Sequence, residues 1–498
     1  MARSCGSPDA ASWSAMPCGP ICCAPRSPRR ANRRGRTARK TLPRPEESMP
    51  MKEPRRQLTL LDAVSLMIGV IIGAGIYQNA PMVARATTSS WGVIGLWALG
   101  GLLSMMGAMS YAELATAYPR AGGDYVYLTR AYGRWAGFLF GWCQLVIVRP
   151  GDIAALALVF ANHGHAIVES ATPGLASVLP TKVLALAGIA ALTAVNAMGV
   201  RFGKWMQNAL TAAKVAGIVF IVVVGYAAVA PHADISEPTV AVPWELALIL
   251  VLFTFGGWNE MAYLAAELKN PTRNIARGLV IGSVGVTLIY LVMNGAFLHT
   301  LGHAGLAATN TVAQDTVGVR LPRIAGVAIN VMICVSSLGA VSGLVFTGSR
   351  ISYALGRDYR LFAWLGQWHP RYETPLRALL AQGVLASSLI VILGDFLETL
   401  IYTSAAVYAF YTATCLSVLV LRVRDPDTER PYRVTGYPVT VLAFAATAAY
   451  LMVSALRYRP MHAVAMGGLL LLGLFLYALH RIGRLAGPQT IETGPESN

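Results

Sequence analysis

The chain has 498 residues, of which 55% are hydrophobic and 13% charged, and its formal net charge at pH 7 is +16. A soluble domain carries about a quarter charged residues, so the low charged fraction and the mean hydropathy of +0.53 exclude a soluble enzyme. The positive charge does not indicate nucleic-acid binding. Residues 1–57 contribute +9 of it, with 13 Lys and Arg against 4 Asp and Glu, and much of the rest lies in short loops.

We expect residues 1–56 to form a disordered basic extension, because they are rich in Arg, Pro, Ser and Ala and lack a helical apolar period. They also lack the continuous apolar core of a secretory signal. Two interpretations of this extension stay open. Translation starts at Met49 or Met51, or the polybasic segment binds the membrane surface.

From Leu58 onward, apolar stretches of membrane-spanning length recur, since a helix needs about 20 apolar residues to cross the hydrocarbon. We therefore predict an all-α polytopic membrane protein, with a permease domain at 57–485 and a short cytoplasmic tail at 486–498. The twelve predicted transmembrane helices cover residues 59–84, 93–117, 135–161, 182–199, 207–230, 244–266, 278–301, 324–355, 377–394, 397–421, 438–456 and 462–480.

Basic residues alternate between the loops that connect these spans. One set of loops is rich in them, as at Arg120, Lys269 and Arg422, and the other set carries few, such as Arg85 and Lys182. The positive-inside rule places the basic loops in the cytoplasm. Both termini are therefore expected in the cytoplasm. An even number of spans agrees with this, because it places both termini on the same side of the membrane.

Two of the spans carry glycines where a helix should be continuous. The first has Gly69, Gly73 and Gly75 near its middle, and the sixth has Gly256 and Gly257. Each glycine costs about 1 kcal/mol in a helix interior relative to alanine. Matching interruptions five spans apart predict inverted repeats around a midplane binding site. Close helix packing through the Gly69–Gly73 spacing is the alternative.

An interrupted helix leaves backbone groups that a ligand can use. Free N–H groups at Ala74, Gly75 and Ile76 suit a carboxylate. Free carbonyls around residues 69–72 and 253–256 suit an ammonium group. The two interruptions together therefore predict a site for a zwitterion.

Ionisable residues inside spans are costly and usually functional. Lys214 lies about two turns into the fifth span, where its ammonium can occupy the place of a coupling cation; snorkelling toward the interface is the alternative. Arg149 and Asp152, three residues apart, predict an intramembrane ion pair, with substrate contact as the alternative. Glu260, after the sixth-span break, lines a proton path or forms a salt bridge to a loop arginine, and the same two roles are open to Glu113 and Glu267.

No constellation for catalysis is present in the sequence. His299 and His303 have a spacing compatible with a metal, but Gly302 and the end of the span favour a loop, so no metal or other cofactor is expected. The chain lacks a Walker lysine motif, which argues against ATP-driven transport. It also lacks a nucleophile elbow and a paired-histidine metalloprotease motif.

Six segments carry a resemblance to a known family, and the sixth-span segment is the most specific of them. They are IGAGIY with the residues before it (68–77), SYAELATAYPRAGGDYVYL (110–128), VRPGDIAALALVFAN (148–162), QNALTAAK (207–214), FTFGGWNEMAYLAAELKNPTRNIARG (253–278) and GSRISYALGRD (348–358). Through them the chain resembles the amino acid–polyamine–organocation superfamily, and within it the L-type-like amino-acid permeases.

The resemblance implies a five-plus-five inverted repeat with broken helices 1 and 6, followed by two extra helices, and alternating access around the breaks. It implies that Lys214 replaces the second sodium ion of sodium-dependent relatives, and that Phe253 acts as a lid. The implied substrate-binding residues are Gly73, Ala74, Gly75 and Ile76 for the carboxylate, Phe253, Thr254, Phe255 and Gly256 for the amino group and gating, and Trp258 and Asn259 in the cavity wall.

The chain departs from the family pattern at several positions. Tyr77 stands where phenylalanine is common, and Phe255 where a tyrosine is common. Asp152 stands where a small uncharged residue is expected, which leaves open whether the substrate is strictly neutral. The loop 162–182 contains no cysteine, so no disulfide-linked heavy chain is expected as a partner.

We predict a secondary active transporter of the plasma (inner) membrane, and not an enzyme. It moves amino acids, with neutral L-amino acids expected first, as a proton symporter or an amino-acid exchanger. One alternative is a polyamine or cationic amino-acid transporter, for which a cavity carboxylate such as Asp152 or Glu260 would be the signature. A membrane amino-acid sensor or channel is the alternative from a different class.

Overall fold

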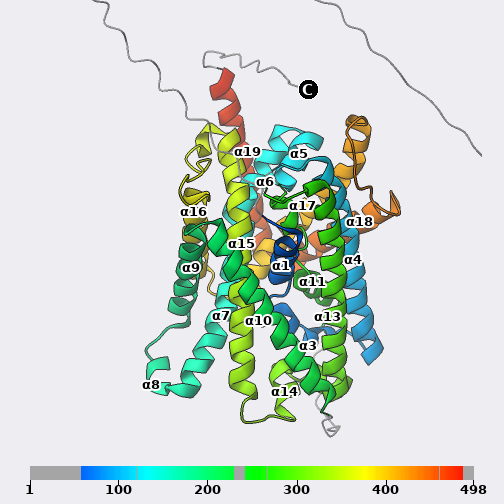
Figure 1. Cartoon of the computed structure of the whole chain (residues 1–498), viewed down its shortest axis with the longest axis vertical. Helices are drawn as coiled ribbons and strands as arrows, with labels where there is room; N and C mark the ends of the chain where they lie inside the picture. The colour runs from blue at the N-terminus through cyan, green and yellow to red at the C-terminus, as the bar shows by residue number, and fades with distance from the viewer. Residues whose placement is uncertain (1–57, 121, 229–241, 266, 459, 486–498) are drawn as a thin grey trace, which may run out of the picture. The chain divides into compact units, whose positions relative to one another are not determined.

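The computed structural model describes residues 58–120, 122–228, 242–265, 267–458 and 460–485, all within the unit Met51–Asn498. The predicted extension at 1–56 and the predicted tail at 486–498 lie outside the described residues. The described chain is helical (Figure 1), and its extended pairing is limited to two isolated bridges, Leu58 with Leu268 and His369 with Thr374.

The helices follow one another with short connections. In the labels of Figure 1 they are α1 (Leu60–Ile71), α2 (Gly75–Gln78), α3 (Ala80–Arg85), α4 (Ser90–Ala117), α5 (Asp124–Tyr132), α6 (Arg134–Cys143), α7 (Arg149–Ala171), α8 (Pro173–Ala176), α9 (Thr181–Ala197), α10 (Val200–Tyr226), α11 (Trp244–Thr254), α12 (Glu260–Tyr263), α13 (Pro271–Ala308), α14 (Val312–Gly318), α15 (Ala325–Asp358), α16 (Leu376–Ile392), α17 (Phe396–Arg424), α18 (Val439–Tyr458) and α19 (Pro460–Leu485). A π-helical turn, Gln144–Val148, joins α6 to α7, and a short 3-10 turn, Arg360–Phe362, follows α15.

This is an all-helical, polytopic membrane protein. Among the described residues, nine helical segments are long and apolar enough to cross a membrane, and three shorter apolar helices, Thr181–Ala197, Trp244–Thr254 and Leu376–Ile392, accompany them. Each predicted span overlaps one of these helices. Among the unbroken spans, the largest difference in bounds is at the third span, whose helix ends at Ala171 rather than at residue 161.

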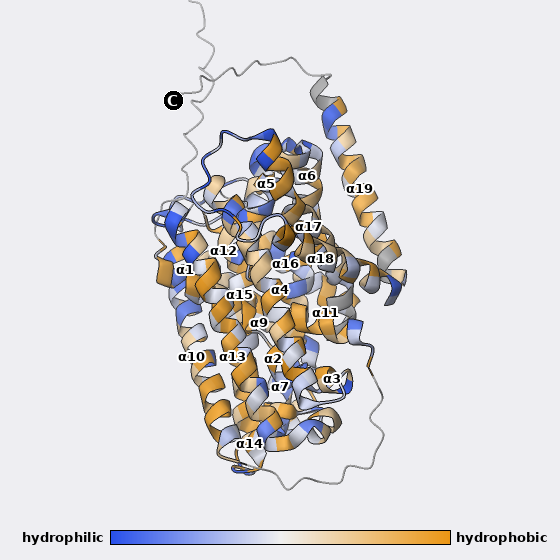
Figure 2. Cartoon of the chain, turned by 90° about the vertical axis from the view of Figure 1, so that its right-hand side faces the viewer, coloured by the Kyte–Doolittle hydropathy of each residue, from blue (hydrophilic) through white to orange (hydrophobic). Residues whose placement is uncertain are grey.

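The outward faces of the helices are apolar, as lipid contact requires. Large hydrophobic side chains such as Val223 on α10, Leu288 on α13 and Phe475 on α19 are more than half exposed. Figure 2 shows apolar residues along α10 and α13 and polar residues gathered toward the ends of the helices. A soluble monomer rarely exposes this much apolar surface to water.

Two helices stop in the middle of the bundle, where the sequence predicts interruptions. α1 ends at Ile71 and helix resumes at Gly75, while α11 ends at Thr254 and helix resumes at Glu260. At the second break Gly257 has φ +103°, and a Cβ there would meet Val70 Cγ1 at 2.7 Å. Only glycine fits a position that is both left-handed and in contact with α1.

Long helices surround the broken ones. α1 packs against α10, α13 and α15, and α11 packs against α4. Figure 1 shows α1 in the middle of the view, with α10 and α15 to one side and α13 and α4 to the other. The backbone at the two breaks is therefore enclosed by protein, which is the condition under which irregular backbone is tolerated inside a membrane.

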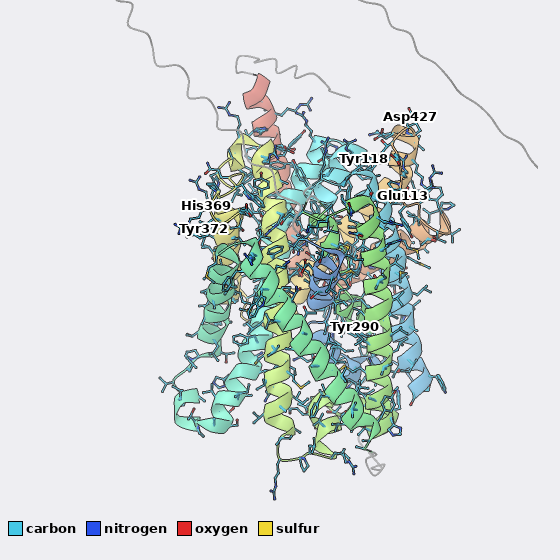
Figure 3. The ribbon with its side chains drawn as sticks, in the orientation of Figure 1. Glu113, Tyr118, Tyr290, His369, Tyr372 and Asp427 are labelled. Atoms are coloured by element: carbon cyan, nitrogen blue, oxygen red, sulfur yellow. The ribbon has the colours of Figure 1, made fainter. Side chains whose placement is uncertain are left out.

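Buried glutamates tie the helices together toward one end of the bundle. Glu113 on α4 accepts bonds from Arg422 at 2.8 and 2.6 Å and from the Val434 N–H at 2.7 Å. Glu267, beyond α12, pairs with Arg350 on α15 at 2.8 Å. Salt bridges to arginines, one of the two roles that the sequence predicts for these glutamates, are thus formed (Figure 3 labels Glu113).

We predict that Glu113→Ala lowers the free energy of unfolding by about 3 kcal/mol, because it leaves the partly buried Arg422 guanidinium and the buried Val434 N–H without their acceptor. Equilibrium unfolding of the detergent-purified protein measures the change. Arg130→Ala is the control: it removes a 3.5 Å pair with Asp425 whose side chains are 38% and 37% exposed, so its cost should stay below about 1 kcal/mol. Equal costs for the two variants would contradict this view of the Glu113 contacts.

Candidate functional site

A cavity with about 950 Å³ of empty space, part of it open to solvent, lies between the ends of the broken helices. Of the predicted substrate-binding residues, those that line it are Gly73, Ala74, Gly75, Phe253, Thr254, Gly256 and Asn259, together with both members of the predicted ion pair, Arg149 and Asp152. Ile76, Phe255 and Trp258 do not line it, and neither does Lys214.

The first break presents unused backbone donors to this cavity. The N–H groups of Ala74, Gly75 and Ile76 have no acceptor among the described residues, whereas Gly73 N donates to Ile71 O at 2.8 Å. Ala74 and Gly75 line the cavity. Beyond them the chain stays helical, since Asn79 between α2 and α3 has φ −87° and ψ −15°. A run of free donors at the start of a half-helix favours an anionic group.

The two breaks touch each other. Asn79 Nδ2 donates to Thr254 Oγ1 at 2.8 Å, and the Tyr290 hydroxyl lies 2.9 Å from Ile71 O and 3.0 Å from Thr254 O. One hydroxyl on α13 thus bridges the last carbonyls of α1 and α11 (Figure 3 labels Tyr290). Tyr290 carries no signal in the sequence, because nothing in the apolar seventh span marks one tyrosine as a contact to two distant helices.

Lys214 lies behind the first break. Its side chain is 1% exposed, and its Nζ donates to Gly69 O at 2.6 Å, Ile72 O at 2.7 Å and Ser336 O at 3.0 Å. This geometry excludes snorkelling. Three carbonyl oxygens around one cation resemble the coordination that a hard metal ion prefers. The same contacts correct one prediction, because the carbonyls of Gly69 and Ile72 are occupied by the lysine and do not face a ligand.

The second break differs in detail from the prediction. Phe253 O accepts from Gly256 N at 2.9 Å, so that carbonyl is already used, but Gly256 O has no donor among the described residues. Phe255 packs between Trp97 and Tyr290, with a ring-centroid distance of 4.9 Å to Tyr290. Its side chain therefore supports the break from behind and cannot contact a ligand in the cavity.

Trp258 has the same supporting role. Its ring lies 4.9 Å from that of Tyr111 and 5.2 Å from that of Tyr411, both between centroids. It fixes the second break itself against Tyr111 on α4 and Tyr411 on α17. Asn259, by contrast, lines the cavity, donates to the Tyr263 hydroxyl at 3.1 Å and accepts from the Tyr411 hydroxyl at 3.1 Å.

The predicted ion pair between Arg149 and Asp152 is replaced by a longer-range one. Arg149 Nη2 pairs with Glu260 Oε1 at 2.8 Å, and both side chains are at most 4% exposed. Asp152 Oδ1 instead accepts from Thr403 Oγ1 at 3.3 Å. The π-helical turn before Arg149 is a local irregularity of a kind that is frequent at functional sites. Spacing within one helix gave no information about Glu260, which is 111 residues away.

Asp124 is a further lining residue that sequence reasoning missed. It is 1% exposed and accepts hydrogen bonds from Tyr111, from Tyr263 at 2.5 Å and from Thr414 at 2.6 Å. Burial raises the pKa of this carboxyl group, and the three hydroxyl donors offset only part of that effect. Gly122 and Gly123, both with positive φ, place it at the start of α5. The glycine pair before an acidic residue is the signal that could have found it.

Comparison with known proteins shows the family of the chain. The amino acid permease family model matches residues 58–468. The chain belongs to that family. This permease is 31% identical over 434 residues to the b(0,+)-type amino acid transporter 1 of Mus musculus, covering 85% of the chain and 88% of the relative. It is 31% identical over 419 residues to the Asc-type amino acid transporter 1 of Mus musculus, covering 82% and 78%. It is 32% identical over 398 residues to the serine/threonine exchanger SteT of Bacillus subtilis (strain 168), covering 78% and 89%.

The family consists of transporters and not enzymes, which is what the absence of a catalytic motif in the sequence predicts. The resemblance that the sequence shows to amino-acid permeases is thereby confirmed. The residue roles inherited from that resemblance remain predictions for this permease, and the contacts above supply the geometry on which they can be tested.

We predict that Gly75→Ala abolishes uptake by this permease. A Cβ at Gly75 would lie 2.5 Å from Thr254 Oγ1 and 3.0 Å from Thr254 Cγ2, so it would force the two breaks apart. Uptake into proteoliposomes measures the loss. Gly285→Ala, on α13 with no atom within 4 Å of the added Cβ, serves as the control and should keep wild-type uptake. Equal uptake by both variants would mean that the breaks need not touch.

Proposed function

We propose that this permease moves amino acids across the plasma membrane by alternating access, as an amino-acid exchanger or a proton symporter, with neutral L-amino acids as its main substrates. Nine long apolar segments and three shorter ones support twelve transmembrane helices. The breaks in the first and sixth of them support a five-plus-five inverted repeat followed by two extra helices. Loop charges support cytoplasmic termini.

The observation that carries the proposal is the set of unused backbone groups around one cavity. The N–H groups of Ala74, Gly75 and Ile76 lack acceptors, and Gly256 O lacks a donor, among the described residues. Buried backbone groups are almost always paired, so a ligand that brings both an anion and a cation fits this place. The carboxylate and ammonium of an amino acid meet both needs at once.

The arrangement at Lys214 bears on what drives transport. Its ammonium already occupies a cage of three carbonyls at the end of α1. A fixed cation there removes the need for a bound sodium ion and leaves protons or a counter-transported amino acid as the coupling partner. Two of the relatives are named amino acid transporters and one is named a serine/threonine exchanger. The last name favours exchange.

A cationic amino acid or a polyamine is the second candidate, and one observation favours it. Among the described residues, the cavity wall carries the carboxylates of Asp124, Asp152 and Glu260 and one guanidinium, that of Arg149. Asp152 has no cationic partner within 4.0 Å among the described residues. A buried excess of negative charge attracts a positively charged side chain. We propose no disulfide-linked partner, since residues 162–182 contain no cysteine.

The test is transport by the full chain in proteoliposomes, with labelled neutral, cationic and acidic amino acids and a polyamine. If the permease is an exchanger, uptake requires amino acid inside the vesicles and is indifferent to a proton gradient. If it is a symporter, an inward proton gradient alone drives accumulation. Binding without accumulation under any condition would contradict the proposal and favour a sensor or channel. Uptake of the polyamine but of no neutral amino acid would favour the second candidate.

Lys214→Ala is the accompanying variant, and it should abolish coupled uptake because the carbonyl cage loses its cation. Lys204→Ala is the matched control on the same helix. Lys204 pairs with Asp62 at 3.1 Å, its side chain is 33% exposed, and it does not line the cavity. Loss of uptake in both variants would indicate a general effect of removing a lysine from α10 and would contradict a specific role for Lys214.

A further inference from the structure

The ion pair between Arg149 and Glu260 leaves one donor and one acceptor unused in the cavity wall. Arg149 Nε donates to Gln144 Oε1 at 3.1 Å, and Nη2 pairs with Glu260 Oε1 at 2.8 Å. Arg149 Nη1 and Glu260 Oε2, both buried, have no hydrogen-bond partner among the described residues. Buried polar atoms are nearly always hydrogen-bonded. We therefore expect these two atoms to form hydrogen bonds with a group that enters the cavity.

The two side chains are held in place by other contacts. The guanidinium of Arg149 lies 5.1 Å from the centre of the Tyr263 ring, and Gln144 in the π-helical turn fixes its Nε. Tyr263 is itself bonded to Asp124 at 2.5 Å. Glu260 N donates to Gly257 O at 3.1 Å within the second break, but among the described residues the side chains of Arg149 and Glu260 make no hydrogen bond to the backbone of either break. The pair is therefore a separate, rigid polar patch in the same cavity.

The chemistry of the unused atoms restricts the partner. A guanidinium nitrogen only donates and an ionised carboxylate oxygen only accepts. An apolar side chain satisfies neither atom. A cationic substrate side chain would be attracted to Glu260 but repelled by Arg149. An anionic substrate side chain would be attracted to Arg149 but repelled by Glu260. A hydroxyl or a carboxamide both accepts and donates, so it can satisfy both atoms without adding charge.

We propose that Arg149 and Glu260 form a side-chain subsite that selects amino acids with a neutral hydroxyl or carboxamide over apolar amino acids of the same size. The inference rests on the proposed function, because the subsite receives the side chain of an amino acid whose carboxylate and ammonium are bound at the breaks. It extends that function by naming the substrate class and the two residues that determine it.

The experiment compares amino acids that match in size and differ in polarity. Competition against labelled substrate in proteoliposomes of the full chain gives the half-saturating concentrations of threonine and valine, and of glutamine and methionine. The readout is the ratio within each couple, so a general loss of transport rate cancels. The comparison of threonine with valine measures the preference for a hydroxyl, and the comparison of glutamine with methionine measures the preference for a carboxamide.

In the wild-type chain the polar member should half-saturate at a concentration about tenfold to a hundredfold lower than the apolar member, in at least one couple, as expected for hydrogen bonds to charged groups. The double variant Arg149→Met/Glu260→Leu removes both charges together, so that no unpaired ion is left buried. Its ratio should fall to about one.

The matched control is Arg350→Met/Glu267→Leu. This pair is also buried at 2.8 Å, but it does not line the cavity, and Arg350 Nη1 is satisfied by Phe346 O at 2.6 Å. The control should keep the wild-type ratio. A wild-type ratio of about one in both couples, or a ratio unchanged in the cavity variant, would overturn the subsite and leave water as the partner of the two atoms.

Failure of the subsite differs visibly from failure of the proposed function. If the proposed function is wrong, no amino acid is transported or competes in the wild-type chain. If only the subsite is wrong, amino acids compete and the ratios do not depend on Arg149 and Glu260. Loss of every substrate in the cavity variant, with the control active, would mean that the pair binds the carboxylate and ammonium, which also contradicts the subsite.

Discussion

The contact between the Lys214 ammonium and three backbone carbonyls is the interaction on which the rest of the site depends. A lysine that is 1% exposed is stable only if its charge is hydrogen-bonded. The carbonyls of Gly69 and Ile72 lack their usual donors because α1 stops at Ile71. The ammonium of Lys214 therefore supplies hydrogen-bond donors to these carbonyls, and the carbonyls supply acceptors to the buried charge. Ser336 joins them, since its carbonyl accepts from the ammonium and its hydroxyl lies 3.0 Å from both Ile72 O and Gly73 O.

With the carbonyl end of the break occupied, what faces the cavity is the donor end, at Ala74 and Gly75. Tyr290 and Asn79 hold the first break against the second, where Gly256 O has no donor among the described residues. The cavity thus separates into a backbone part at the breaks and a polar side-chain part at Arg149 and Glu260. A ligand that spans both parts couples α12, which carries Glu260, to α7. Such coupling is what a transporter needs if substrate binding is to bias its closure.

Much of the fold and part of the site follow from local sequence properties. Apolar runs of membrane length predict the spans, because lipid imposes that length on each helix, and clustered glycines predict the breaks. Contacts between distant segments are beyond such reasoning. Spacing along one helix predicts a pair between Arg149 and Asp152, whereas the actual partner, Glu260, reaches Arg149 through the packing of α12 against the bundle. The family resemblance places Phe255 in the amino-group and gating segment and Trp258 in the cavity wall, but their side chains point into aromatic clusters.

The central claim is that the N–H groups of Ala74, Gly75 and Ile76 bind the substrate carboxylate. Hydrogen–deuterium exchange at these amides, measured by mass spectrometry on the full chain in lipid, tests it most directly. A saturating transported amino acid should slow exchange in the peptide that contains residues 73–79, and the corresponding amine without the carboxylate should not. Exchange that is unchanged by the amino acid, or slowed equally by the amine, would contradict the account.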